Sequence, residues 1–314
     1  MITNKKIEKN ALFKHSVLVG SALLISLGIQ FVFSFAMISF GLSQEQIDNL
    51  LTDTWTGYLL NTLLSVVTLT FPFLILKNLT EKSISELFQF NSNTSKIAPI
   101  CVVFAVGLSF AANYVSAFFN EVLKRFFDFE AVQPTIGDND FSDPFELIFT
   151  LVCVAAVPAL VEEFAFRGLV LNSLRKFGDW PAIFVSALLF GILHGNFIQI
   201  PFAFVVGIGL GIATVMTNSL WPAIIAHFIN NSYALLSNAY GQENQTPYLY
   251  VFYLFIVAGV FCLITLIKKG CFKQMKKQPS ELSAFAKTVR LILSPTVLIF
   301  IALMLVTAFL SKAA

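Results

Sequence analysis

The sequence predicts an all-α, polytopic transmembrane helix bundle, and two observations carry this prediction. Of the 314 residues, 57% are hydrophobic and only 12% are charged, and the mean hydropathy is +0.79. A soluble domain usually carries about 25% charged residues, so this chain lacks the polar surface that a water-soluble protein of its size needs. The second observation is a series of long apolar runs, each near the roughly 20 residues that a membrane helix requires.

Nine apolar segments are candidates for membrane spans, and we expect eight or nine of them to cross the bilayer. They are 16–41, 57–76, 97–118, 145–175, 180–197, 199–217, 220–240, 248–267 and 291–310. Residues 119–128 alternate charged and aromatic side chains, which favours a helix in the membrane interface. We therefore divide the chain into N-terminal helices with this interfacial helix (1–144), a central core (145–240) and C-terminal helices (241–314), all in one membrane unit.

The positions of Lys and Arg predict the orientation of the spans, because cytoplasmic loops carry an excess of both residues. With the N-terminus in the cytoplasm, every Lys and Arg falls on the inner side except Lys124, Arg125 and Lys312. The basic N-terminus leads into a long apolar run without an evident small-residue cleavage site, which favours a retained helix over a signal peptide. We expect a multi-pass protein of the cell membrane.

Composition and spacing also exclude several classes of function. The net charge of +2 does not indicate a nucleic-acid partner. The cysteines lack the spacing of metal-binding or redox pairs; they are Cys101, Cys153, Cys262 and Cys271. Three glycines at alternate positions lie in an apolar helix and indicate close helix packing, not nucleotide binding; they are Gly207, Gly209 and Gly211.

Ionisable residues inside the apolar runs mark a candidate site, since each costs roughly 2.5–3.5 kcal/mol at the centre of a membrane helix on insertion scales. Glu162, Glu163 and Arg167 lie together in the segment 145–175. Glu163 and Arg167 are one helical turn apart, in the order that favours an ion pair, so Arg167 offsets part of the repulsion between the two carboxylates. Glu162 points about 100° away from Glu163 and stays available. An ion pair that only fixes packing needs a single Glu.

Two further pairs of residues lie in neighbouring apolar segments. Phe190 and His194 are four residues apart, and so are His227 and Asn231, so each pair shares one helix face. Taken singly, a polar side chain of this kind is often a hydrogen-bonded packing residue between membrane helices. We assign Asn113, which has no polar partner at helical spacing, to packing for that reason.

Membrane depth brings the first two of these motifs together. Glu162 lies about 15 residues before the turn at 177–181 and His194 about 13 after it, so at 1.5 Å per residue both lie roughly 20 Å from that turn. The two side chains then meet on neighbouring antiparallel helices. Two of the three histidines of the chain belong to this cluster, and packing alone does not explain that concentration.

Two schemes for amide hydrolysis fit these side chains. In the first, a carboxylate beside a neutral imidazole takes a proton from water, and a second His and an Asn amide donate hydrogen bonds to the developing oxyanion. In the second, Glu162, His194 and His227 bind Zn²⁺, which keeps a water as its fourth ligand when it is catalytic. The sequence contains neither a His-Glu-x-x-His zinc helix nor a Gly-x-Ser-x-Gly elbow.

In this order, the three motifs resemble the pattern of the CAAX protease and bacteriocin-processing (CPBP) family of intramembrane endopeptidases, also called the Abi family. Its pattern is Glu-Glu-x-x-x-Arg, Phe-x-x-x-His and His-x-x-x-Asn, found here at 162–167, 190–194 and 227–231. Each motif alone is weak, but all three in hydrophobic helices are specific. The resemblance covers about residues 145–240.

The resemblance implies a role for each residue of the motifs. The implied catalytic residues are Glu162, His194, His227 and Asn231. Glu162 would be the general base and His194 its partner on the catalytic water, while the other two would form the oxyanion site. The implied supporting residues are Glu163, Arg167 and Phe190. The family is described both as metalloproteases and as glutamate-dependent proteases, so a zinc cofactor stays open.

The resemblance also implies a membrane-embedded or lipidated peptide or protein as substrate. The predicted orientation and the positions of the site residues along their segments place the site in the cytoplasmic half to the middle of the bilayer. Eukaryotic relatives cleave prenylated C-terminal tripeptides, and bacterial relatives are linked to bacteriocin or pheromone maturation, to self-immunity and to membrane-anchored regulators. Two other functions stay open. One is a catalytically silent immunity, scaffold or transport protein of the same fold, although internal repeats typical of transporters are not evident. The other is a proton-coupled ion carrier that uses the Glu pair.

Overall fold

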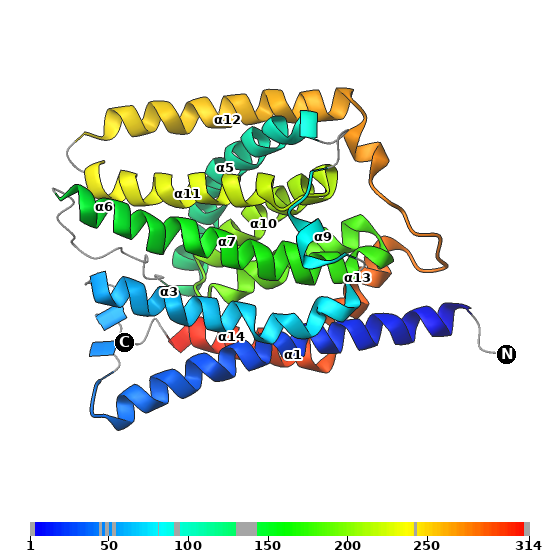
Figure 1. Cartoon of the computed structure of the whole chain (residues 1–314), viewed down its shortest axis with the longest axis horizontal. Coiled ribbons are helices and arrows are strands. Elements are labelled where there is room, and N and C mark those ends of the chain that lie inside the picture. The colour runs from blue at the N-terminus through cyan, green and yellow to red at the C-terminus, as the bar shows by residue number, and fades with distance from the viewer. Residues whose placement is uncertain are drawn as a thin grey trace.

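The computed structural model of the chain is a bundle of helices (Figure 1). It describes residues 4–43, 46–47, 50–51, 55–80, 82–90, 95–129, 143–241 and 244–310, and these residues contain no β-strand. The all-α bundle that the sequence predicts is therefore confirmed. All four cysteines are free.

Three groups of helices follow one another along the chain. The N-terminal group comprises α1 (Asn4–Ser39), α3 (Trp55–Thr70), the 3-10 helix η1 (Pro72–Leu79), α4 (Ile84–Leu87), the 3-10 turn η2 (Ser95–Ile97) and α5 (Ala98–Phe127). The central group begins with one continuous helical stretch: α6 (Pro144–Thr150), η3 (Leu151–Ala156), α7 (Val157–Glu163), η4 (Phe164–Leu171), α8 (Asn172–Leu174) and η5 (Arg175–Phe177). It continues with α9 (Asp179–Leu193), α10 (Gln199–Thr217) and α11 (Trp221–Tyr240). The C-terminal group comprises α12 (Gln245–Lys268), the 3-10 helix η6 (Cys271–Gln274), α13 (Ala284–Ile292) and α14 (Pro295–Leu310).

The number of candidate membrane spans is smaller than the sequence predicted. Among the described residues, six helical stretches are long and apolar enough to cross a membrane, and α13 with α14 makes a seventh if their 67° bend lies within one span. The two predicted spans that fall short are α9, which has 15 residues, and α11, whose His and Asn side chains lower its hydropathy. Both form as helices, and both carry candidate site residues.

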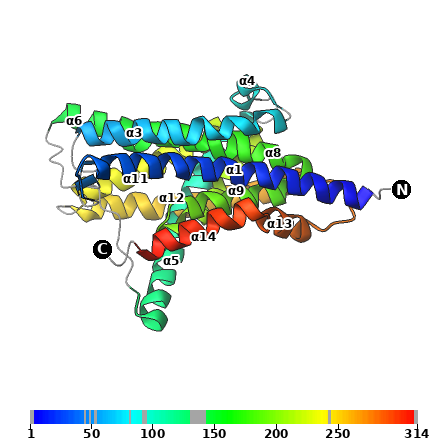
Figure 2. The ribbon, with the colours of Figure 1, turned by 90° about the horizontal axis from the view of Figure 1, so that it is seen from below.

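The stretch 119–128, expected as an interfacial helix, continues α5 as far as Phe127. Asp128 then ends the helix in the left-handed conformation, with φ of 50°. Figure 2 shows this end of α5 projecting beyond the neighbouring helices. Phe126 and Phe127 are exposed there, so the projecting end offers aromatic side chains to its surroundings.

Close contacts between small residues hold the centre of the bundle together. Helix α10 packs against α5, α9 and α11, and a Cβ atom on Gly207 would lie only 2.9 Å from the Cα atom of Ala187 in α9. In the same way, a Cβ atom on Gly259 of α12 would lie 2.8 Å from the Cα atom of Gly107 in α5. These contacts confirm the packing role predicted for Gly207, because small residues let membrane helices approach closely.

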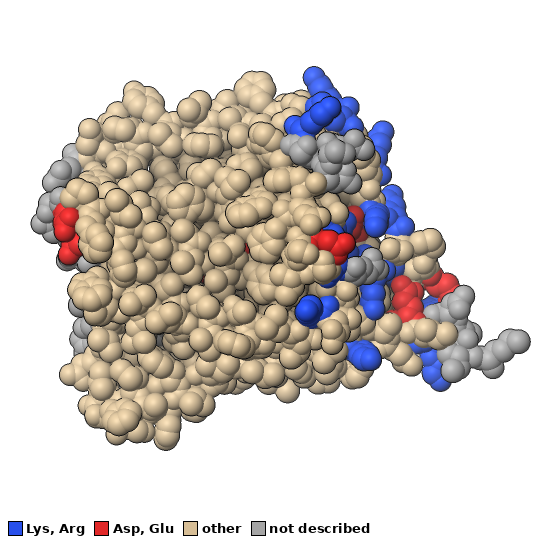
Figure 3. All heavy atoms as spheres, in the orientation of Figure 1, with Lys and Arg blue, Asp and Glu red and all other residues tan. Residues whose placement is uncertain are grey.

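Most of the Lys and Arg side chains visible in Figure 3 gather at one end of the bundle. We call this the basic end; it contains the start of α1, η5, and the segment 269–283 between α12 and α13 (Figure 1). The charge asymmetry on which the predicted orientation rests is thus present in three dimensions. That the basic end faces the cytoplasm stays a prediction of the positive-inside rule.

Candidate active site

The Glu pair lies in α7, a short α-helical stretch between two π-helical stretches, η3 and η4. Pro158 lacks an amide hydrogen and cannot donate to the carbonyl four residues before it. The widened turn of η3 directly precedes it, and there the Val157 amide donates to the carbonyl of Val152, five residues back. Such widened turns are frequent at functional sites, and here they flank the two carboxylates.

Glu163 is the centre of a fully buried ionic network. Its Oε1 atom accepts a hydrogen bond from Nη1 of Arg167 at 2.7 Å, and both side chains are 0% exposed. The same oxygen lies 2.9 Å from Nδ1 of His227 in α11. Arg167 also donates to the carbonyl of Gly207 at 3.3 Å. The ion pair expected from the spacing therefore forms, and it connects three helical segments.

Glu162 has different surroundings from its neighbour. Its side chain is 21% exposed, and its Oε2 atom lies 3.9 Å from Nε2 of His227. That separation is too long for a direct hydrogen bond and close enough for a shared water or substrate atom. His227 thus faces Glu163 with one ring nitrogen and Glu162 with the other.

Phe190 is the aromatic platform around which the site is assembled. Its ring lies edge-to-face with His194 at 4.9 Å and with His227 at 5.9 Å between centroids. The guanidinium carbon of Arg167 lies 4.3 Å from the centre of the same ring, within cation–π distance. The structure therefore brings side chains from η4, α9 and α11 together on one ring.

His194 is the C-cap residue of α9, and only one of its two ring nitrogens, Nδ1, is used in a contact with that helix. Its Nδ1 atom lies 2.9 Å from the carbonyl oxygen of Phe190, one turn earlier. That contact orients the ring and leaves Nε2 to face other partners. The side chain is neither fully buried nor fully exposed.

A groove of about 500 Å³ opens beside His194 and Asn231. Its remaining lining is mostly aromatic and carboxamide: Phe110, Asn113, Gln199, Phe202, Asn230, Tyr233 and Phe252 are among its residues. The lining comes from α5, α10, α11 and α12. Residues from α5, α10, α11 and α12, with His194 at the end of α9, thus form an amphipathic groove that includes two of the predicted site residues.

Two asparagines of this groove were not identified as site residues from the sequence. Asn113, assigned to packing, does donate to the carbonyl of Phe110 in its own helix at 3.0 Å, but it also lines the groove. Asn230 donates to the side-chain oxygen of Asn231 at 3.4 Å. The adjacent pair of asparagines in α11 was the available signal for Asn230; the position of Asn113 depends on how α5 packs and left no local signal.

The side chains of the site provide only some of the ligands that a catalytic metal ion needs. Glu162 and His227 approach each other from two helices, which provides two of the three protein ligands typical of catalytic zinc. Within the described residues, however, no group of three or more His, Cys, Asp or Glu side chains is arranged to hold a metal ion. The zinc scheme with Glu162, His194 and His227 stays a prediction, and no step below passes through a metal.

A family model described as "Type II CAAX prenyl endopeptidase Rce1-like" matches residues 144–233 of the chain. The match begins at α6 and ends within α11, so it includes all three motifs of the site. No curated protein and no solved structure matches the chain. Residues 144–233, which contain all three motifs, are therefore similar to the Rce1-like family of type II CAAX prenyl endopeptidases.

Proposed function

We propose that this protein hydrolyses a peptide bond of a membrane-associated peptide or protein, with Glu162 as the general base. The observation that carries the proposal is the unequal state of two adjacent carboxylates. Glu163 is buried and bound by Arg167 and His227, whereas Glu162 is partly exposed and has no hydrogen bond shorter than 3.5 Å to His227. The ion pair with Arg167 explains why Glu163 is buried there, and a role as general base explains why Glu162 stays accessible.

In the proposed reaction, Glu162 accepts a proton from a water molecule as that water attacks the carbonyl carbon of the scissile peptide. His194 orients the water through Nε2, the ring nitrogen that is not directed at Phe190. The protonated Glu162 then gives its proton to the leaving amine, which completes the hydrolysis and restores the carboxylate. General acid–base catalysis of this kind contributes typically 10²–10⁴-fold to the rate.

His227 and Asn231 are the proposed donors to the oxyanion. The Nδ1 hydrogen of His227 is directed at the Glu163 carboxylate, and Nε2 of the same ring faces Glu162. The oxyanion role of His227 requires a hydrogen on Nε2 as well, because only a ring nitrogen that carries a hydrogen can donate.

The groove supports a membrane-associated substrate. Its aromatic walls, with Phe110, Phe202 and Phe252, suit an apolar or lipidated segment, and its carboxamides offer partners to a peptide backbone. Asn230 orients the amide of Asn231 by donating to its oxygen, which leaves the amide hydrogens of Asn231 available to the oxyanion.

Comparative peptidomics of cells that express the wild type or Glu162→Gln tests the proposal. This substitution keeps the shape of the side chain and removes the base, so we expect processing of the substrate to fall by about 10²–10⁴-fold. Glu146→Gln, at an exposed position in α6, is the matched control and should process normally. Retained cleavage by Glu162→Gln at wild-type protein levels would refute the role of Glu162.

Metal analysis of the purified protein, with and without His194→Ala, separates the two hydrolytic schemes. The water-activation scheme described here predicts full processing activity after dialysis against a chelator. Metal bound at about one equivalent and lost in His194→Ala would instead favour the zinc scheme.

A further inference from the structure

A second polar pocket, of about 140 Å³, lies at the basic end and shares no residue with the groove beside Asn231. Four of its lining residues are cationic: Lys82, Arg175, Lys176 and Lys276. The others carry carboxamides: Asn172, Asn218 and Gln278. Among the described residues, no Asp or Glu lines this pocket. Its chemistry is therefore that of an anion site, with positive charge and neutral hydrogen-bond donors around one small space.

Hydrogen bonds hold the positive charges in place. Asn218, in the left-handed turn between α10 and α11, accepts a bond from Nζ of Lys82 on its carbonyl and one from Nη1 of Arg175 on its side chain, both at 2.9 Å. Asp179 accepts from Nε of Arg175 and from the backbone amide of Lys276, both at 2.8 Å. The pocket is thus fixed by parts of the chain that are far apart in sequence.

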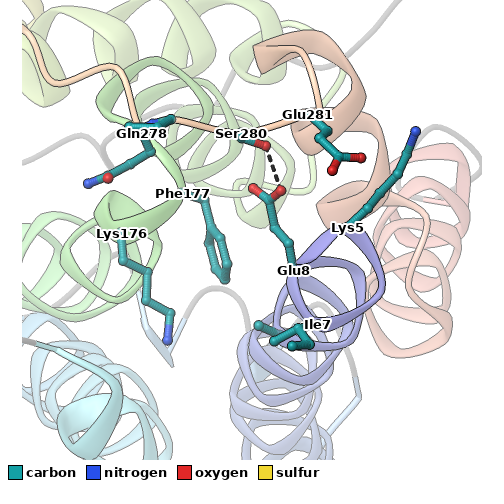
Figure 4. Close-up of a pocket in the computed structure, with 10 residues that line it drawn as sticks. Lys5, Ile7, Glu8, Lys176, Phe177, Gln278, Ser280 and Glu281 are labelled. Atoms are coloured by element: carbon teal, nitrogen blue, oxygen red, sulfur yellow. Dashed lines mark hydrogen bonds between the residues drawn. The ribbon is translucent and has the colours of Figure 1, made fainter. Parts of the chain in front are cut away.

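The neighbouring pocket at the basic end has a different charge balance. Figure 4 shows Lys176 and Gln278 on one side of that larger pocket and α1, with Lys5 and Glu8, on the other. There Glu8 pairs with Lys287 at 3.2 Å, so cations and carboxylates compensate each other. The smaller pocket shares Lys176 and Gln278 with this larger one. Its four cations outnumber the two carboxylates described beside them, Asp179, which binds Arg175, and Glu86, which attracts Lys82.

The excess positive charge affects Lys82 directly. Partial burial, followed by repulsion from Arg175, lowers the pKa of Lys82 to about 8, and Lys276 adds to this effect while Glu86 opposes it. A lysine near a compensating anion would instead have a raised pKa. The electrostatics and the geometry agree that an anionic partner would stabilise this pocket.

Two exposed tryptophans indicate where the pocket lies relative to the bilayer. Trp180 is the second residue of α9 and Trp221 the first of α11, and their side chains are 41% and 42% exposed. These helix starts directly follow η5 and Asn218, which line the pocket. Because Trp is enriched at the level of the lipid headgroups, the pocket lies at the depth where headgroup phosphates are found.

We propose that this pocket binds the phosphate group of an anionic phospholipid. Basic pockets between membrane helices recognise lipid headgroups in this way, and the carboxamides add neutral donors to the phosphate oxygens. A free phosphate ion offers the same chemistry, but it has no affinity for the tryptophan level of the bilayer. Asn172 also donates to the carbonyl of Arg167 at 2.7 Å, so the bound lipid would brace the helical segment that carries the Glu pair.

Lipid binding by the full-length protein tests this proposal without any turnover. We would measure the phosphatidylglycerol retained by protein from mixed nanodiscs by native mass spectrometry, and the thermal stabilisation that this lipid gives over phosphatidylcholine alone. For Lys82→Gln/Lys276→Gln we expect an apparent affinity at least about tenfold lower, since charged groups make the stronger hydrogen bonds to phosphate. Lys273→Gln, an exposed cation at the same end outside the pocket, should bind like the wild type.

Three further results decide the matter. The charge-retaining Lys82→Arg/Lys276→Arg should recover most of the affinity, which shows that the Gln variant lost charge and not its fold. Wild-type affinity in the Lys82→Gln/Lys276→Gln variant would overturn the proposal. So would equal stabilisation by inorganic phosphate in phosphatidylcholine nanodiscs, because the ligand would then be a free ion. The lipid measurements do not require peptidase activity. Retained cleavage by Glu162→Gln would therefore refute the proposed function without affecting the lipid proposal, and a failure of lipid binding would leave the proposed function intact.

Discussion

The buried site and the basic end differ in how their charged side chains are compensated. At the site, Arg167, Glu163 and His227 are almost completely removed from solvent and bind one another at 2.7–2.9 Å. At the basic end, Arg175 binds the Asp179 carboxylate and the Asn218 carboxamide, Lys82 binds only a backbone carbonyl, and an excess of positive charge is left. Charges deep in a membrane protein must be paired within the protein, whereas charges at the headgroup level can leave part of the pairing to water or lipid.

This difference predicts how much stability a substitution costs in each of the two regions. A change at the site leaves a buried partner without compensation, which is expensive. A change to a lysine at the basic end alters a partly exposed balance of charges, which is worth less.

The largest loss of stability is expected for Glu163→Leu. Arg167 and His227 would both lose their buried acceptor, and removing one partner of a buried ion pair costs about 3–5 kcal/mol. Thermal and denaturant unfolding in detergent micelles measures the loss. The double variant Glu163→Leu/Arg167→Leu should recover much of it, because no unpaired charge stays behind. If the double variant is no more stable than the single one, pairing is not what stabilises this region.

Gly207→Ala should be the next most disruptive change. The added Cβ atom would meet the backbone of Ala187 at 2.9 Å and displace the carbonyl that accepts from Arg167, so we expect a loss of about 1–3 kcal/mol from overpacking. Gly28→Ala in α1 is the control, since nothing lies within 4 Å of the added atom there. Equal unfolding temperatures for the two variants would contradict the close α9–α10 contact.

Phe190→Leu removes the platform but leaves the charges paired. The cation–π contact with Arg167 is worth about 2 kcal/mol when desolvated, and the contacts with both histidines are lost too. We expect a smaller loss of stability than for Glu163→Leu, with a clear loss of processing because His194 and His227 become less ordered. Phe184→Leu, on the same helix at an exposed position, should keep both properties.

The smallest effect is expected from the pH dependence of Lys82. Its pKa is about 8 in the folded protein and returns to its ordinary value near 10.5 on unfolding, so the unfolded chain binds more protons between these values. Stability relative to Lys82→Gln should therefore rise as pH rises from about 8 to 10.5. Unfolding in micelles without anionic lipid measures it. Saturating phosphatidylglycerol should weaken this rise, because a bound phosphate keeps the lysine protonated.

Local spacing predicted a substantial part of the site. Glu163 and Arg167, four residues apart, form the expected ion pair, and the approach of α10 to α9 through Gly207 follows from its small side chain. The ion pair depends on spacing within one helix turn and the close contact on the size of one residue. Both can therefore be predicted from the sequence alone. The helical nature of every predicted segment follows from apolar composition in the same way.

The number of spans and the details of the groove were not accessible to the same reasoning. Helix α9 has only 15 residues as folded, and α11 is too polar to count as a candidate span, although both were predicted as spans from their apolar runs. The π-helical stretches before and after the Glu pair were likewise not evident from the sequence. Asn113 reaches the groove only because α5 packs beside α11 there.

An apolar helical chain with three polar motifs follows from the amino-acid order alone, because periodicity and composition act over a few residues. The packing of the helices was needed to show that Glu163 is bound by His227 while Glu162 stays accessible, and that cations from distant segments surround one small pocket. Those relations depend on the rotation and tilt of whole helices, which are set by packing between segments many residues apart.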